Sequence, residues 1–221
     1  MIKLLQAEHI SLAEISAAAS FSLESGAMSI VLTPKDEINL YLTKLLIGLE
    51  APRSGKIVLF NTDAASISNN ELREIRRRIG VVYGSGGLIS NLKVWENLIL
   101  PLNYHQQLNP AEVEARGLAL LSRLGYTGRL MALPGHLTIS QKKLVGFARA
   151  MLITPDVMLY ESPDSGLNQE EKDTFFRIAT EFHREKPERA SLFITSNQEV
   201  VRFLPEASVI NLTNGPKGQI P

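Results

Sequence analysis

Residues 44–57 read KLLIGLEAPRSGKI, and the fold assignment depends on this stretch. Its last residues, from Lys56 on, open a short apolar run that is typical of a β-strand. Runs of the same kind recur on both sides, separated by helical patterns, and this alternation predicts a largely parallel sheet covered by helices. We predict strands over residues 28–33, 56–60, 80–83, 157–160, 191–195 and 208–212.

Local signals mark the starts of several helices. Ser68 followed by Glu71 is a capping box. Asn109 followed by Pro110 is an N-cap with proline in the first turn, and it predicts a helix toward residue 124. We expect further helices over residues 140–152, with Ser140 able to open the first turn, and after Asn168. The mostly helical segment 91–149 lies between sheet strands, so we predict one domain over residues 1–221 with an inserted helical subdomain at 91–149.

Composition narrows the class of protein. The 221 residues include 23 basic and 23 acidic side chains, and this balance argues against a nucleic-acid partner. There are no cysteines, which fits a reducing cytoplasm. No apolar run approaches the roughly 20 residues that span a bilayer. We therefore expect a cytoplasmic protein that reaches the inner face of the cell membrane only through a partner.

Several segments follow the quoted stretch in a fixed order. They are RRRIGVVY at 76–83, LISNLKVWENL at 88–98, ARA at 148–150 and PDSGLN at 163–168. Together with residues 44–57 they resemble the nucleotide-binding subunit of ABC transporters over nearly the whole chain. The resemblance implies an α/β fold of the P-loop NTPase type, with a mainly parallel sheet, flanking helices and an inserted helical lobe. In that family the subunit dimerises, docks a membrane permease and hydrolyses ATP with magnesium.

The family's phosphate loop falls on residues 33–41, counted back from Gly48. ATP binding needs glycines that expose backbone N–H groups, together with a lysine and a magnesium-binding hydroxyl. Here the three glycine positions hold Thr33, Asp36 and Ile38, the lysine position holds Asn39, and the hydroxyl position holds Leu40. Glu37 adds a second negative charge where a triphosphate would lie, and Tyr41 ends the altered stretch.

Other family positions are changed as well. Glu161 and Ser162 stand where the family has a magnesium-binding aspartate and a water-activating glutamate. Gly84 replaces the Q-loop glutamine, and Ser196 replaces the switch histidine. The signature loop, LSGGQ in the family, is Leu137, Thr138, Ile139, Ser140 and Gln141. Its Thr138, Ser140 and Gln141 keep hydrogen-bonding groups, but we expect Ile139 to obstruct a partner's nucleotide.

Three functions follow from this pattern. The first is a pseudo-ATPase without a bound cofactor, which docks a permease or a second ATPase subunit. The second is an active ATPase with a rearranged site, using ATP, magnesium, Lys35 and Glu161. The third is a sensor that binds a less charged ligand beside Ile38, Leu40 and Tyr41.

Partner contacts are expected at two places by the resemblance. Leu88 lies where the family docks its permease. Trp95 lies there too, and a place in the core of the helical lobe fits it equally well. Ser165, Gly166 and Asn168 match the family's dimer interface. Gly84-Ser85-Gly86-Gly87-Leu88, with Pro101-Leu102 and Asn109-Pro110-Ala111-Glu112 downstream, is similar to transporters that move lipids with MCE proteins. The sequence does not specify the transported substrate.

Overall fold

One sheet of the protein has five parallel strands in the order β6-β7-β8-β3-β9. The computed structural model describes residues 2–12, 18–104 and 109–213. The strands of this sheet are β3 (Met28–Leu32), β6 (Ile79–Val82), β7 (Val157–Glu161), β8 (Ala190–Thr195) and β9 (Ser208–Asn211). Each coincides with a predicted strand, and the predicted fold class is confirmed.

A second sheet is antiparallel, in the order β2-β1-β4-β5. Its strands are β1 (Lys3–Ile10), β2 (Ala19–Glu24), β4 (Lys56–Leu59) and β5 (Thr62–Asp63). The predicted strand at 56–60 therefore exists as β4, but it pairs antiparallel with β1 rather than joining the parallel sheet. In β1, buried Leu5, Ala7 and Ile10 are interleaved with more exposed polar residues, as expected for a strand with one face in the core.

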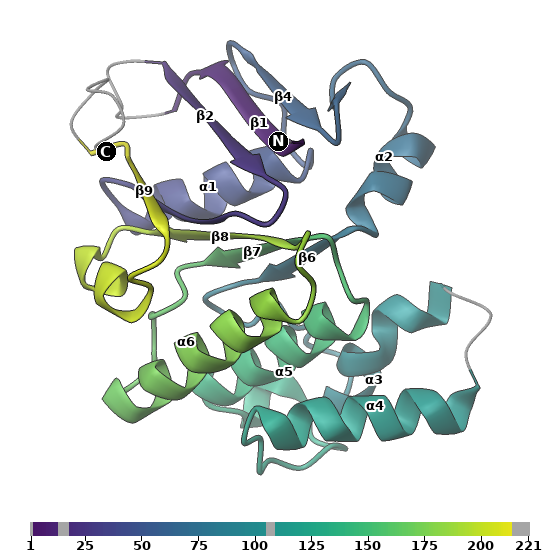
Figure 1. Ribbon diagram of the computed structural model, residues 1–221. Helices are drawn as coiled ribbons and strands as arrows, with labels where there is room; N and C mark the ends of the chain where they lie inside the picture. The colour runs from purple at the N-terminus through teal and green to yellow at the C-terminus, as the bar shows by residue number, and fades with distance from the viewer. Residues whose placement is uncertain (1, 13–17, 105–108, 214–221) are drawn as a thin grey trace.

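Helix α1 (Asp36–Leu46) lies between the two sheets (Figure 1). Its Leu42, Leu45 and Leu46 are completely buried and belong to the same apolar cluster as residues of both sheets. This packing fixes the start of α1 against the carboxyl ends of the parallel strands. Beyond the antiparallel sheet, α2 (Asn69–Arg76) leads into β6.

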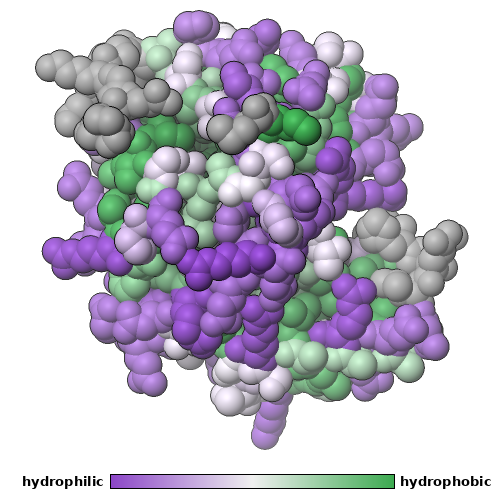
Figure 2. Space-filling model, in the orientation of Figure 1, coloured by the Kyte–Doolittle hydropathy of each residue, from purple (hydrophilic) through white to green (hydrophobic). Residues whose placement is uncertain are grey.

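The opposite face of the parallel sheet is covered by α5 (Ile139–Leu152) and α6 (Gln169–Arg184) (Figure 1). Phe147 of α5 and Phe175 of α6 meet the ring of Tyr160 edge-on, with centroids 5.5 and 6.0 Å away. Tyr160 also stacks on Phe193 at 4.4 Å. The outer face of α6 is largely hydrophilic (Figure 2), and the apolar side chains of this helix are buried in the core.

Two further helices, α3 (Val94–Ile99) and α4 (Pro110–Arg123), contact α5. The chain also forms three 3₁₀ turns in the described residues: η1 (Leu100–Tyr104), η2 (Pro134–His136) and η3 (Gln198–Phe203), the last of which precedes β9. The predicted N-caps at Ser68, Asn109 and Asn168 are confirmed, and each accepts a backbone N–H in the first turn of its helix. Within the described residues, no helix is both long and apolar enough to span a bilayer.

Candidate functional site

Three of the predicted site residues lie where strands β3, β7 and β8 end. Thr33 follows β3, Ser162 follows β7 and Ser196 follows β8. The Thr33 N–H donates to the Thr195 carbonyl at 2.9 Å, and the Ser162 N–H donates to the Ile194 carbonyl at 2.9 Å. Ligands of open parallel sheets usually bind at this edge. The structure therefore brings together positions that are far apart in the sequence.

The stretch 33–41 is mostly helix rather than loop. Residues from Asp36 on belong to α1, and the Ile38 N–H already donates to the Lys35 carbonyl at 3.2 Å. A phosphate-binding turn uses backbone conformations that glycine permits and other residues disfavour, which is consistent with a helix at this position. Asp36 and Glu37 lie in the first turn, where carboxylates stabilise the positive end of the helix. This N-terminus is thus occupied by the protein's own negative charges.

Asn39 lies at the centre of a buried hydrogen-bond network. Its side chain is fully buried, and its Oδ1 accepts a hydrogen bond from the Thr33 hydroxyl. Its Nδ2 donates to Ser162 Oγ at 2.9 Å and to Asp36 Oδ1 at 3.2 Å. The Ser196 hydroxyl donates to the same Asp36 oxygen at 2.6 Å. Asn39 therefore uses its oxygen and both hydrogens of its amide within the protein.

Glu161 ends the other branch of this network. The Ser162 hydroxyl donates to Glu161 Oε1 at 2.6 Å, and the Gly84 N–H donates to Glu161 Oε2 at 2.8 Å. Glu161 is 8% exposed and Ser162 is 6% exposed. Both carboxylate oxygens thus have protein partners. Across the described part of the chain, no cluster of three or more histidine, cysteine or acidic side chains has the geometry to hold a metal ion.

The signature segment forms the start of α5, and one detail of its prediction is wrong. Thr138, not Ser140, caps the helix: Thr138 Oγ1 accepts the Gln141 N–H at 3.1 Å, and Gln141 Oε1 accepts the Thr138 N–H at 3.1 Å. The reciprocal pair satisfies two amides that a helix leaves free. Leu137 is buried, while Ile139 is 53% exposed.

The expected partner contacts lie on different kinds of surface. Leu88 and Trp95 are partly buried and pack against the core cluster, and the Trp95 ring faces Gly117 of α4. Ser165 and Gly166 are exposed, and Gly166 lies against Ile139. Asn168 is exposed, but its side chain caps α6 by accepting the Glu171 N–H at 3.0 Å.

Sequence reasoning missed a fully buried cation beside the network. Lys143 of α5 donates to three backbone carbonyls that follow β7. Its position in the segment QKKL gives no hint of burial, because lysine is among the residues least often found inside.

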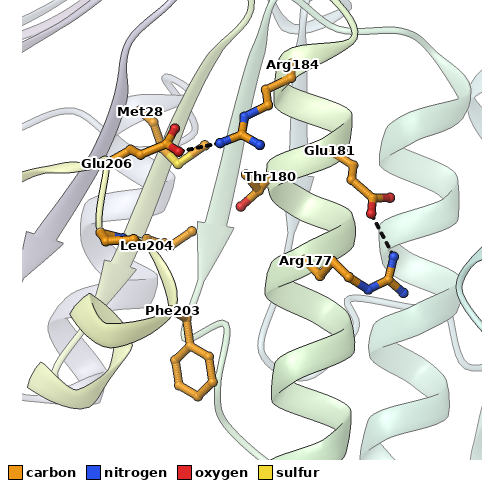
Figure 3. Close-up of a pocket in the computed structure, with 9 residues that line it drawn as sticks. Met28, Arg177, Thr180, Glu181, Arg184, Phe203, Leu204 and Glu206 are labelled. Atoms are coloured by element: carbon orange, nitrogen blue, oxygen red, sulfur yellow. Dashed lines mark hydrogen bonds and ion pairs between the residues drawn. The ribbon is translucent and has the colours of Figure 1, made fainter.

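A cavity of about 320 Å³ lies elsewhere, between α6 and η3 (Figure 3). Met28, Phe203 and Leu204 line its apolar side. Its charged residues are paired with one another, Arg184 with Glu206 and Arg177 with Glu181. None of residues 33–41 lines it.

Comparison with known proteins agrees with this architecture. The probable ribonucleotide transport ATP-binding protein mkl of Mycobacterium tuberculosis is 27% identical over 187 residues, which are 85% of this chain and 52% of that protein. A methionine import ATP-binding protein, MetN 1 of Rhodopseudomonas palustris, is 32% identical over 163 residues, which are 74% and 43% of the two chains. The chain thus spans about half the length of these relatives.

Solved structures show the same fold. The dimeric structure of MJ0796, a bacterial ABC transporter cassette, superposes with a TM-score of 0.83 at 19% identity, covering 98% of this chain and 99% of that one. CbiO1 of Clostridium perfringens, part of the transporter complex CbiONQ, gives a TM-score of 0.73 at 18% identity over 96% and 86% of the two chains. Residues 41–165 match the family described as ABC transporter. This chain belongs to the ABC transporter family.

Proposed function

We propose that this chain is a non-catalytic ATP-binding-cassette subunit, retained to dock a membrane permease or a partner ATPase. The observation that carries the proposal is the network around Asn39, in which the altered family positions hydrogen-bond to one another. A nucleotide would have to break these bonds, and a buried polar group left without a partner costs roughly 1–3 kcal/mol.

Charge adds to this barrier. Asp36 and Glu37 occupy the end of α1 that would face a triphosphate. At about 6 Å, each repulsion costs roughly 1 to 3 kcal/mol between water-like and surface-like dielectric constants. The lysine that would offset the phosphate charge in the family is replaced by Asn39, a neutral side chain already in use.

An active ATPase is the second candidate, because the relatives are named ATP-binding proteins. It would use Lys35 and Glu161 in a rearranged site with ATP and magnesium. Titration calorimetry with ATP and magnesium separates the two candidates. We expect no binding tighter than about 100 µM, a free energy near −5.5 kcal/mol. Tighter binding would favour the active enzyme, and a family cassette with an intact glycine loop is the positive control.

The docking role has its own test. A tagged copy expressed in its native cell should recover a permease or a second ATPase subunit, and recovery of neither would contradict the role.

We extend the proposal to lipid transport, because residues 84–88 are similar to those of transporters that move lipids with MCE proteins. Recovery of an MCE-type binding protein in the same complex supports that extension, whereas a complex containing a binding protein for ribonucleotides or amino acids would contradict it.

A further inference from the structure

Lys143 places an ammonium group in the protein interior, where charged side chains are rare. Its side chain is fully buried, and its Nζ donates to the carbonyl oxygens of Ser162 at 3.0 Å, Pro163 at 2.9 Å and Ser165 at 2.5 Å. Three acceptors match the three hydrogens of an ammonium group. The residues 162–166, between β7 and α6, are called the 162–166 loop below. Lys143 thus joins this loop to α5.

The surroundings of Lys143 supply a compensating charge. Asp164 and Glu161 favour its ammonium form, as does Glu171, while Lys172 opposes it. The Phe175 ring centroid lies 5.9 Å from Nζ. Burial nevertheless lowers the pKa of Lys143 to about 8. Burying an ammonium group costs solvation free energy even when the group is paired. An apolar side chain would fill the same space without that cost, so packing alone does not explain a lysine here.

The 162–166 loop contains two residues with positive φ. Ser162 has a left-handed backbone conformation with φ 44°, which is unfavourable for residues other than glycine. Gly166 also has a positive φ, of 70°. The Ser162 carbonyl accepts the Ser165 N–H at 3.1 Å in addition to Lys143. Asp164 of the loop also accepts hydrogen bonds from Thr195 Oγ1 at 3.2 Å and Asn197 Nδ2 at 2.7 Å. Lys143 differs from these contacts because it binds three backbone carbonyls of the loop at once.

Helix α5 fixes a second loop by similar means. Arg149 donates to the Gly87 carbonyl at 2.9 Å. A Cβ on Gly146 would come within 2.4 Å of the Gly86 carbonyl oxygen, so the two backbones touch. The segments after β6 and after β7 are both attached to the helix that begins at the signature segment.

We propose that Lys143 is a positioning residue, which holds the 162–166 loop in one conformation so that exposed Ser165 and Gly166 are presented to a partner without any nucleotide. This inference rests on the proposed docking function and deepens it. Lys143 can order the loop without a ligand, because all three of its acceptors are backbone carbonyls of the loop itself.

Amide hydrogen exchange on the nucleotide-free chain tests this role. The variant Lys143→Met keeps the side-chain volume and removes the donors. We expect exchange at Ser165 and Leu167 to become about ten-fold faster or more, with β8 unchanged. Lys142→Met, the same change one residue earlier, is the matched control and should leave the loop as it is. Unchanged exchange in Lys143→Met would overturn the inference.

Chemical rescue adds a readout that loss of packing alone would not give. The variant Lys143→Ala lacks the atoms of propylammonium. We expect added propylammonium to restore the protection of Ser165, and tetramethylammonium, which has no N–H, to fail. Equal effects of the two ions would count against the role, and if Lys143→Ala does not fold, Lys143→Met decides. A wild-type loop protected only in the presence of ATP and magnesium would instead refute the proposed function.

Discussion

At the scale of single residues, Asn39 decides the chemistry of this site. An amide has both donors and an acceptor, so it can bridge the Thr33 hydroxyl on one side and Ser162 on the other. A lysine at this position could donate but not accept. Under the proposed function, Asn39 therefore bonds to the protein where the family's lysine would bind phosphate.

Replacing Asn39 should destabilise the fold. We expect Asn39→Ala to lower the free energy of unfolding by about 1–3 kcal/mol, because buried Thr33 and Ser162 lose a hydrogen-bond partner. Urea denaturation measures the change. Leu40→Ala, the next residue in α1 with a 41% exposed side chain, should change stability by less than about 0.5 kcal/mol. Equal effects would mean that the network contributes nothing.

Lys143 should leave a signature in the pH dependence of stability. Its pKa is lowered by burial from 10.5 to about 8. Between these values the unfolded chain binds more protons than the folded one, so the contribution of Lys143 to stability rises with pH. We expect the wild type to gain on the order of 1–2 kcal/mol over Lys143→Met between pH 7.5 and 9.5 in urea denaturation. A constant difference between the two proteins would show that Lys143 does not titrate in this window.

At the scale of elements, the start of α5 depends on Thr138. Its reciprocal bonds with Gln141 satisfy the first turn of the helix. We expect Thr138→Ala to cost about 1 kcal/mol of stability in thermal or urea denaturation. Ser140 lies inside the first turn, so Ser140→Ala should cost much less. A larger effect at Ser140 would restore the prediction made from sequence.

The same scale shows what sequence can predict here. The capping box at Ser68 was readable because its partner Glu71 lies three residues away. The buried strands of the parallel sheet were readable from their apolar runs. The strand β1 was not, because polar residues interrupt its apolar ones and its partners β2 and β4 follow later in the chain. The early start of α1 and the burial of Lys143 depend on tertiary contacts.

At the scale of the whole molecule, α1 lies between the two sheets, and α5 and α6 cover the opposite face of the parallel sheet (Figure 1). The proposed loss of nucleotide binding leaves this architecture intact, because most residues of the two apolar clusters lie outside residues 33–41. Under the proposed function, fold and nucleotide chemistry are separable in this chain, because the first depends on buried apolar area and the second on a few side chains at one edge of the sheet.

The most direct test is a crystal structure of the chain grown with a nonhydrolysable ATP analogue and magnesium. We expect Asn39 to keep its bonds to Thr33 and Ser162, with no triphosphate ordered at the start of α1. Ordered phosphates held by residues 33–41, with the Asn39 side chain turned away from Ser162, would contradict this expectation.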